Sequence, residues 1–304
     1  MSVRDCEEPV CTGNDNDAIA QVIEPKLKDL GGFNVRRVLP AKSQRRVGPF
    51  IFFDHMGPST FPEGEGINVR PHPHIGLCTL TYLFDGEIMH RDSLGYVQAI
   101  QPGAVNWMTA GRGIVHSERT SDEMRAREYL LHGLQIWIAL PDGKEEIEPD
   151  FEHYPAGSLP VISQPGLAMT LIAGEAFGEK APVNVHSRLF YLHIDADAGA
   201  QIELPADHEE CAVYVVDGQI AADGCTFDAG HMIVFAEGAS PAIEATAASR
   251  IVAIGGEPLA SDRTVFWNFS SSSDARIEQA KADWQSGRFD LIPGDDDEFI
   301  PLPE

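Results

Sequence analysis

Two short motifs contain the residues of this chain that are best suited to metal chemistry. In PHPHIG, at residues 71–76, His72 and His74 are separated by a single residue. In IVHSE, about forty residues later, His116 and Glu118 have the same spacing. Residues i and i+2 of a β-strand point to the same face of a sheet. On a strand, each motif would therefore present two metal-binding side chains on one side.

The combined donor set is three imidazole nitrogens and one carboxylate oxygen. Two such strands meeting inside a barrel would bring the four side chains together. This set suits iron, nickel, manganese, cobalt, copper or zinc, and on an octahedral ion it leaves positions open for a substrate or dioxygen. We therefore predict one divalent transition metal bound by His72, His74, His116 and Glu118. The simpler alternative, a polar surface location, would be favoured for any one of the 11 histidines taken singly.

Other polar patterns are weaker signals. TAGRG at 109–113 superficially suggests a phosphate-binding loop, but it lacks a third glycine and the GK[ST] ending, which favours a tight turn. Ser117 could suggest a hydrolase triad with its neighbours, yet adjacent strand residues face opposite sides, which directs Ser117 away from both. His90 and Asp92 share one face of a predicted hairpin, and either a place near the pocket or ordinary strand polarity explains them.

Short β-prone segments separated by turn residues surround these motifs. With 28 glycines and 21 prolines, the chain is expected to be rich in turns. This rhythm predicts an all-β protein built from sandwiches or barrels. The predicted strands cover residues 33–39, 49–53, 78–84, 88–91, 104–108, 134–139, 168–173, 189–194, 211–216, 232–236 and 250–254. Near the C-terminus, Asp274 is the predicted cap of an amphipathic helix that places Ile277, Ala280 and Trp284 on one face.

The length of 304 residues predicts two domains, because one hydrophobic core rarely organises so long a chain. An acidic, turn-rich segment at 141–150 marks the expected boundary. We predict a flexible N-terminal arm over 1–20 and an N-terminal metal-binding domain over 21–145. The C-terminal domain is expected to cover 146–304 and to include the helix and an acidic tail.

The two halves of the chain echo each other. LFDGEI at 83–88 resembles VVDGQI at 215–220, and residues 102–113 parallel residues 229–240. One duplicated barrel type accounts for both echoes. We predict a metal-free C-terminal domain, because the positions equivalent to the four ligands are apolar: Leu204, Ala206, Ile243 and Ala245.

The net charge of the chain restricts the classes of molecule that it is expected to bind. The 47 acidic and 22 basic residues give a formal net charge of -25, which repels phosphate backbones and anionic membranes. Direct nucleic-acid or membrane binding is therefore not expected, whereas metal ions, small molecules and regulatory protein partners remain compatible. No run approaches about 18 apolar residues, and the N-terminus lacks the pattern of a secretion signal. Five cysteines without CxxC spacing favour free thiols in a reducing compartment, so we predict a cytoplasmic protein.

Longer segments around the motifs resemble the pirin family. They are RPHPHIGLCTLTYLFDGEIMHRDS at 70–93, WMTAGRGIVHSE at 107–118 and WNFSSSSDARIEQAKADWQSGRF at 267–289. The resemblance implies a bicupin, two stacked β-barrels of the cupin or jelly-roll type, with the metal only in the N-terminal barrel at the four positions given above. Two departures stand out: Ile75, where many pirins carry arginine, and Cys78, where many other cupins carry a glutamate ligand. Cys78 could line the pocket or touch the metal, and a small buried thiol is its expected role.

The resemblance also implies a function. It suggests quercetin 2,3-dioxygenase activity, in which a metal-bound flavonol is opened by dioxygen with release of carbon monoxide and Glu118 acts as the general base. Fe(II) is the first expectation for the metal, with Ni, Mn, Co, Cu or Zn as alternatives. The family implies a second function as well, that of an iron-bound, redox-responsive regulatory protein that acts through protein partners without turnover.

Overall fold

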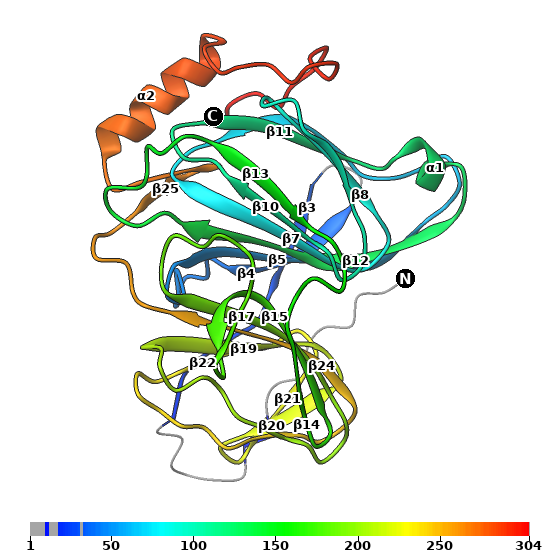
Figure 1. The fold of residues 1–304 in the computed structure, drawn as a ribbon, viewed down its shortest axis with the longest axis vertical. Helices are drawn as coiled ribbons and strands as arrows, with labels where there is room; N and C mark the ends of the chain where they lie inside the picture. The colour runs from blue at the N-terminus through cyan, green and yellow to red at the C-terminus, as the bar shows by residue number, and fades with distance from the viewer. Residues whose placement is uncertain (1–9, 12–17, 31–32, 304) are drawn as a thin grey trace. The chain divides into compact units, whose positions relative to one another are not determined.

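Most of the regular secondary structure is β-strand, as the sequence predicts, and the described residues also form two helices (Figure 1). The computed structural model describes residues 10–11, 18–30 and 33–303. Every predicted strand overlaps an observed one. The predicted flexible arm lies mostly outside the described residues, although two strands, β1 (Val10–Cys11) and β2 (Ile19–Ile23), begin within its range.

The described residues fall into two compact units. One comprises the described part of residues 27–36, 52–157 and 259–304 and contains both chemical motifs; we call it the histidine unit. The other comprises the described part of 1–26 together with 37–51 and 158–258, and we call it the apolar-core unit.

Two sheets build the histidine unit. The larger has the strand order β13-β10-β7-β12-β5-β4-β3, and the smaller has the order β6-β11-β8-β9. The larger sheet contains β3 (Lys26–Asp29), β4 (Asn34–Leu39), β5 (Phe50–Phe61), β7 (Leu77–Asp85), β10 (Val105–Thr109), β12 (Tyr129–Ala139) and β13 (Asp150–Tyr154). The smaller sheet contains β6 (Asn68–His74), β8 (Ile88–Asp92), β9 (Val97–Ile100) and β11 (Ile114–Arg119).

Side chains from both sheets share one core. Leu83 and Leu131 of the larger sheet belong to the same buried cluster as Ile88 and Ile100 of the smaller sheet. Because alternate residues of a strand face one side, one shared cluster means that the sheets pack face to face and enclose an interior. The smaller sheet carries the chemical motifs.

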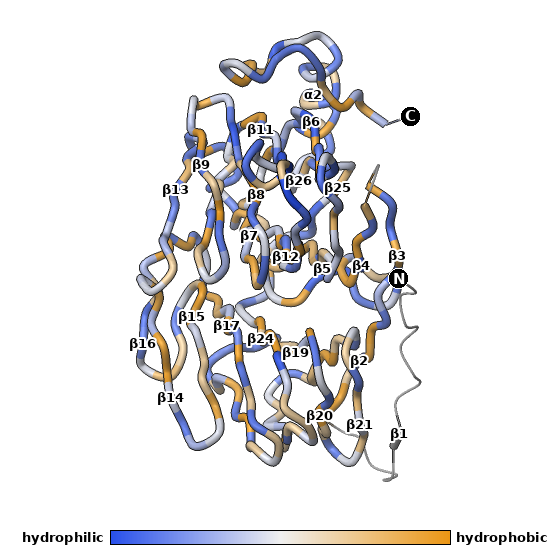
Figure 2. Tube along the Cα trace, turned by 90° about the vertical axis from the view of Figure 1, so that its right-hand side faces the viewer, coloured by the Kyte–Doolittle hydropathy of each residue, from blue (hydrophilic) through white to orange (hydrophobic). Residues whose placement is uncertain are grey.

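The apolar-core unit has a second pair of sheets, ordered β14-β15-β17-β24-β19-β22-β2 and β1-β21-β20-β23-β18, with β16 beside β15. Ile243 and Ala245 lie in its hydrophobic core, and its strands mix hydrophobic and hydrophilic residues (Figure 2). The remaining bounds are β14 (Val161–Gln164), β15 (Leu167–Ala176), β16 (Glu179–Lys180), β17 (Leu189–Ala196), β18 (Gln201–Ile202), β19 (Glu210–Asp217), β20 (Gln219–Ala222), β21 (Cys225–Asp228), β22 (Met232–Phe235), β23 (Ile243–Ala245) and β24 (Ser249–Gly256).

The C-terminal helix is present, but its cap differs from the prediction. Helix α2 (Asp274–Gln285) begins after Ser273, whose hydroxyl accepts a hydrogen bond from the Arg276 backbone N–H at 3.4 Å. Asp274 lies instead in the first turn, where its charge favours the helix dipole. The helix buries Ile277 and Ala280 against strand β26, and the remaining elements are α1 (Asp122–Arg125), β25 (Thr264–Phe266) and β26 (Phe269–Ser271).

The units do not follow the linear division predicted at residues 145 and 146. Residues 259–304 group with the histidine unit, and Ile19–Ile23 pairs with β22 of the apolar-core unit. Charged side chains explain the first grouping, because Arg263 pairs with Asp142 at 2.7 Å and Ser271 donates a hydrogen bond to Glu145 at 2.8 Å. Contacts between distant parts of the chain leave no local signal in the sequence.

The expectation of five free cysteines is wrong for Cys225, which is disulfide-bonded. Cys78 and Cys211 are free and buried. An odd number of cysteines still permits one disulfide, so the cysteine count did not predict or exclude it. The cysteine argument for a reducing compartment therefore no longer holds. Among the described residues, no helix has the length and hydrophobicity needed to span a bilayer.

The turn after the first motif provides a test of packing. Gly76 has a φ of 68°, and a Cβ at this position would lie 1.9 Å from the carbonyl oxygen of Ser270. Gly95 also has a positive φ, 93°, but its Cβ would meet nothing within 4 Å. In urea unfolding, Gly95→Ala should cost about 1 kcal/mol of backbone strain and Gly76→Ala roughly 3 kcal/mol or more. Equal losses in the two variants would show that the close approach of Ser270 is unimportant.

Candidate metal centre

Strands β6 and β11 are neighbours, and their antiparallel register places the two motifs side by side. His116 lies opposite His72, and Ile114 lies opposite His74. β6 is at the edge of its sheet, where Pro71 and Pro73 are tolerated because an edge strand needs fewer backbone donors. Because alternate residues of a strand face opposite sides, the two prolines lie on the outer face and the two histidines on the inner face.

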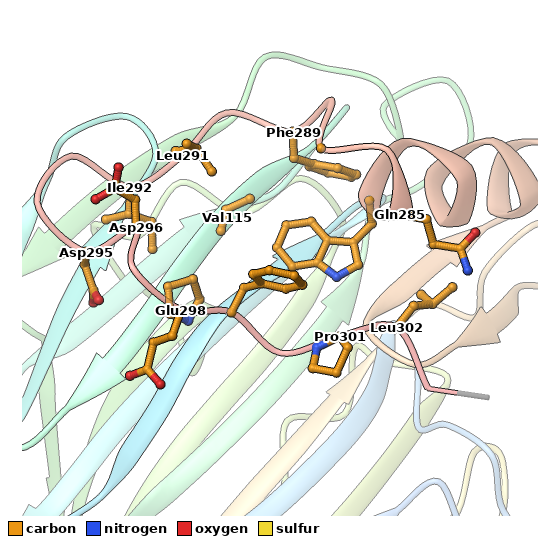
Figure 3. A pocket seen from close by; sticks show the side chains of 14 residues that line it. Val115, Gln285, Phe289, Leu291, Ile292, Asp295, Asp296, Glu298, Pro301 and Leu302 are labelled. Atoms are coloured by element: carbon orange, nitrogen blue, oxygen red, sulfur yellow. The ribbon is translucent and has the colours of Figure 1, made fainter.

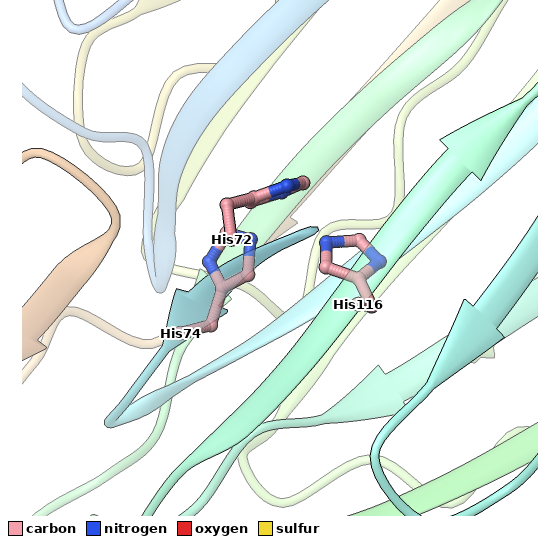
Figure 4. A group of neighbouring side chains, drawn as sticks. All are labelled: His72, His74 and His116. Atoms are coloured by element: carbon pink, nitrogen blue, oxygen red, sulfur yellow. The ribbon is translucent and has the colours of Figure 1, made fainter. Parts of the chain in front are cut away.

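The three imidazoles converge inside the histidine unit (Figure 4). One ligand atom from each of His72, His74 and His116 lies within 4.8 Å of the others. The ring centroids are 4.4 Å apart for His72 and His116 and 5.1 Å apart for His72 and His74. All three side chains are buried. The alternative of a surface location is therefore excluded for these histidines.

The hydrogen bonds around the rings leave nitrogens free at the centre of the cluster. His72 Nδ1 donates to the backbone carbonyl of Arg70 at 2.8 Å, so its Nε2 carries a lone pair. His116 Nε2 and both ring nitrogens of His74 make no hydrogen bond within normal limits, although the backbone of Asn268 lies near His74. Buried polar atoms without partners are costly. A bound cation would satisfy these nitrogens, so the donor set fits a transition metal.

His90 and Asp92 orient His116, and sequence reasoning left their role open. Asp92 Oδ2 lies 2.8 Å from His90 Nε2, and His90 Nδ1 lies 3.4 Å from His116 Nδ1. Asp92 is held in turn by the backbone N–H groups of Leu94 and Tyr96. If the carboxylate accepts the His90 proton, His90 accepts from His116, and Nε2 of His116 points its lone pair inward. This is the support that metal-ligating histidines usually have.

Burial keeps the imidazoles neutral. It lowers the pKa of His72 to about 4, with a smaller contribution from His90. Burial and the neighbouring histidines also hold the pKa values of His74 and His116 well below the usual range. A neutral imidazole is the form that binds a metal, so the cluster is ready to coordinate at neutral pH.

Glu118 is buried in the same interior but is not one of the clustered ligand atoms. Its Oε1 accepts a hydrogen bond from Gln135 at 3.1 Å, and Thr81 provides another. Burial raises the pKa of the Glu118 carboxyl, while His90 and these two hydrogen bonds partly offset the rise. The structure thus brings three of the four predicted ligands together, and it places the carboxyl beside partners from the opposite sheet.

Aromatic and thiol side chains complete the interior. Trp137 lies edge-on to His74 at 5.1 Å and stacks on Phe52 at 3.8 Å, so aromatic rings cover one side of the cluster. Cys78 is buried, and its thiol contacts the Thr109 hydroxyl at 3.6 Å. Burial raises the pKa of Cys78 to about 12. The thiol does not belong to the cluster of potential metal ligands that the three histidines form. Its expected role as a buried thiol matches these contacts.

Ser117 points to the outer face of β11, as strand alternation predicts. Its hydroxyl donates to Asp295 at 2.6 Å, and Arg119, two residues further on, forms a bidentate pair with the same carboxylate at 2.8 and 2.6 Å. A hydrolase triad of Ser117 with His116 and Glu118 is therefore excluded.

A β unit with three convergent histidines, in a chain with two cupin-type domains, defines a bicupin protein. The chain belongs to the pirin family: the Pirin model matches residues 32–138 and the Pirin C-terminal cupin domain model matches residues 191–290. A pirin-like protein of Caulobacter vibrioides is 50% identical over 93% of this chain and 99% of the relative. The predicted family and bicupin fold are confirmed.

Solved structures agree with this assignment. A quercetin 2,3-dioxygenase from Acinetobacter baumannii is 37% identical, with a TM-score of 0.87 over 93% of this chain and 95% of that one. The bacterial pirin YhhW from Escherichia coli, solved in complex with nickel(II), shares the fold at 19% identity, with a TM-score of 0.63 over 79% of this chain and 99% of that one.

The low pKa of His72 predicts a pH dependence of stability in the metal-free protein. The unfolded chain takes up a proton near pH 6.5 and the folded chain only near pH 4, so acidification between these values favours unfolding. From pH 7.5 to 5, His72 alone should remove roughly 2 kcal/mol of unfolding free energy. Urea unfolding in the presence of a chelator measures this loss. In His72→Leu, the unfolding free energy should fall less between the two pH values, by the amount that His72 contributes. An identical pH effect in both proteins would contradict the assignment.

Proposed function

We propose that this protein is a metal-dependent dioxygenase that opens the ring of quercetin-like flavonols. One flavonol and one dioxygen would yield a ring-opened product and carbon monoxide. The single observation that carries the proposal is the buried convergence of the free nitrogens of His72, His74 and His116. The quercetin 2,3-dioxygenase from Acinetobacter baumannii, which resembles this chain over most of its length, supports the substrate class.

The proposed metal ligands are His72, His74, His116 and Glu118, with Fe(II) as the first candidate and Ni, Mn, Co, Cu or Zn as alternatives. Three nitrogens and one carboxylate oxygen restrict the metal without deciding it, because availability also matters. When bound, the ion would act as a Lewis acid that acidifies the 3-hydroxyl of the flavonol.

Glu118 is the proposed general base for that hydroxyl proton. Burial raises the pKa of this carboxyl, so it takes up a proton more readily than an ordinary glutamate, as an efficient base at neutral pH should. Gln135 and Thr81 fix its orientation from the opposite sheet. Trp137 borders the cluster at His74, and Phe52 stacks on Trp137, so aromatic rings cover one side of the cluster.

The metal site and the activity can be tested together. Purified protein should contain about one metal per chain, and with one of the first-row metals it should consume quercetin and release carbon monoxide in air. His74→Ala should lose both the metal and at least about 100-fold in turnover, because it removes a central ligand. His208→Ala, in the apolar-core unit, is the control and should change neither. Bound metal without turnover by any first-row ion would contradict the dioxygenase and favour the iron-bound regulatory alternative, which would act through protein partners.

The base role of Glu118 has a separate test. Glu118→Gln keeps the size of the side chain but removes the base, so turnover of the metal-loaded protein should fall by about 10² to 10⁴. Ser117→Ala changes the neighbouring residue on the outer face and should leave turnover within about twofold. Steady-state kinetics at equal metal content distinguish the two. Normal turnover in Glu118→Gln would remove this residue from the mechanism.

A further inference from the structure

A cavity lies on the outer face of β6 and β11, the strands that carry the histidines. Its volume is about 450 Å³, and its lining includes Pro71 of β6 and Val115 of β11. Figure 3 labels Val115 and most of the other lining side chains. Neighbouring residues of a strand face opposite sides, so these two side chains are back to back with His72 and His116. The cavity is thus separate from the metal centre. A role of this cavity in binding does not rest on the proposed dioxygenase activity.

The segment after helix α2 forms the opposite wall and is held to the sheet at two points. The Ile300 backbone N–H donates to the carbonyl of Pro71 at 2.8 Å, on the edge strand. Asp295 pairs with Arg119 and accepts from Ser117. Burial raises the pKa of Asp295, but these hydrogen bonds outweigh it and lower the net pKa, so the carboxylate is ionised. The cavity is therefore preformed.

Aromatic rings make up much of the interior. Trp284 meets Phe289 at 5.8 Å and Phe299 at 5.6 Å, and both pairs are nearly perpendicular, at 80° and 88°. The Trp284 indole N–H donates to the Ile300 carbonyl at 3.0 Å, which fixes the ring. Phe299 and Leu291 remain 56% and 64% exposed, although both line the cavity. Large apolar side chains exposed around one hollow mark a binding site.

The charged groups of the cavity are all acidic. Its lining contains Asp295, Asp296 and Glu298 and no lysine or arginine. Arg119 pairs with Asp295 and Glu298, and Arg91 also acts electrostatically on Asp295, so two guanidiniums offset two of the three carboxylates. Asp296 has no ion pair among the described residues and is exposed. Negative charge therefore remains beside the aromatic rings.

We propose that this cavity binds an organic ammonium cation with an apolar or aromatic body. The ring faces attract a cation through their quadrupole, by about 0.5 to 2 kcal/mol. The apolar walls would receive the body of the ligand, and the carboxylates would complement its charge. An anion would be repelled by the same groups. Trp284, Phe299 and Asp296 are the residues that would recognise the ligand.

Isothermal titration calorimetry of the full chain with benzyltrimethylammonium chloride tests the proposal, with phenylacetate as an anionic probe of similar size. At low ionic strength we expect the cation to bind with a Kd below about 1 mM and phenylacetate at least about tenfold more weakly. Phe299→Leu keeps an apolar side chain but removes the ring, so it should weaken cation binding by about three- to thirtyfold.

The charge contribution has a matched control. Asp296→Asn should weaken cation binding at least about twofold. Asp297→Asn makes the same change in net charge at an exposed residue outside the lining, and it should leave the affinity unchanged. Equal binding of both probes, no binding of the cation at about 10 mM, or unchanged affinity in both Phe299→Leu and Asp296→Asn would overturn the proposal. Circular dichroism would verify that the variants are folded.

Discussion

Three neutral imidazoles whose lone pairs face each other in a buried interior are the constraint on which the site depends. Burial makes protonation of these rings unfavourable, as the low pKa of His72 shows. The inner nitrogens of His74 and His116 carry no proton and have no hydrogen-bond partner, so their lone pairs are buried and unsatisfied. A transition metal would accept these lone pairs, because imidazole nitrogens are among its common ligands. Folding thus prepares a donor set that is costly when empty.

Strand β11 links this interior to the outer face of the sheet. His116 and Glu118 point inward, whereas Ser117 and Arg119 point outward to Asp295. The bidentate contact of Arg119 with Asp295 is a geometrically specific pair and is only partly exposed. The C-terminal segment therefore holds the strand that carries one histidine ligand. This explains why the segment groups with the histidine unit although it is far away in sequence.

One of the two departures from the expected family pattern, Ile75, has a packing reason. Ile75, where many pirins are expected to carry arginine, is fully buried and packs against Phe269, Ile277 and Ala280. A charge there would lie within the cluster under helix α2, which favours an apolar residue. Ile75 therefore helps to attach helix α2 to the histidine unit.

Much of the fold and part of the site could be predicted from the sequence, because strand alternation is a local signal. The i, i+2 spacing of His72 and His74 predicted a shared face correctly, and the outward direction of Ser117 followed from the same rule. The role of His90 could not be predicted, because its contact with His116 depends on the register of β8 against β11. The hydrogen bond that Glu118 accepts from Gln135 could not be predicted either, because Gln135 belongs to another sheet.

The unit division and the disulfide at Cys225 were likewise beyond local patterns. Both depend on which distant segments meet after folding, and periodicity carries no information on that.

Anomalous diffraction from metal-loaded crystals tests the central claim most directly. Data collected on both sides of the absorption edge of the bound metal should show a single peak about 2.0–2.3 Å from the inner nitrogens of His72, His74 and His116. A strong peak elsewhere in the chain, with no density among these three rings, would contradict the account.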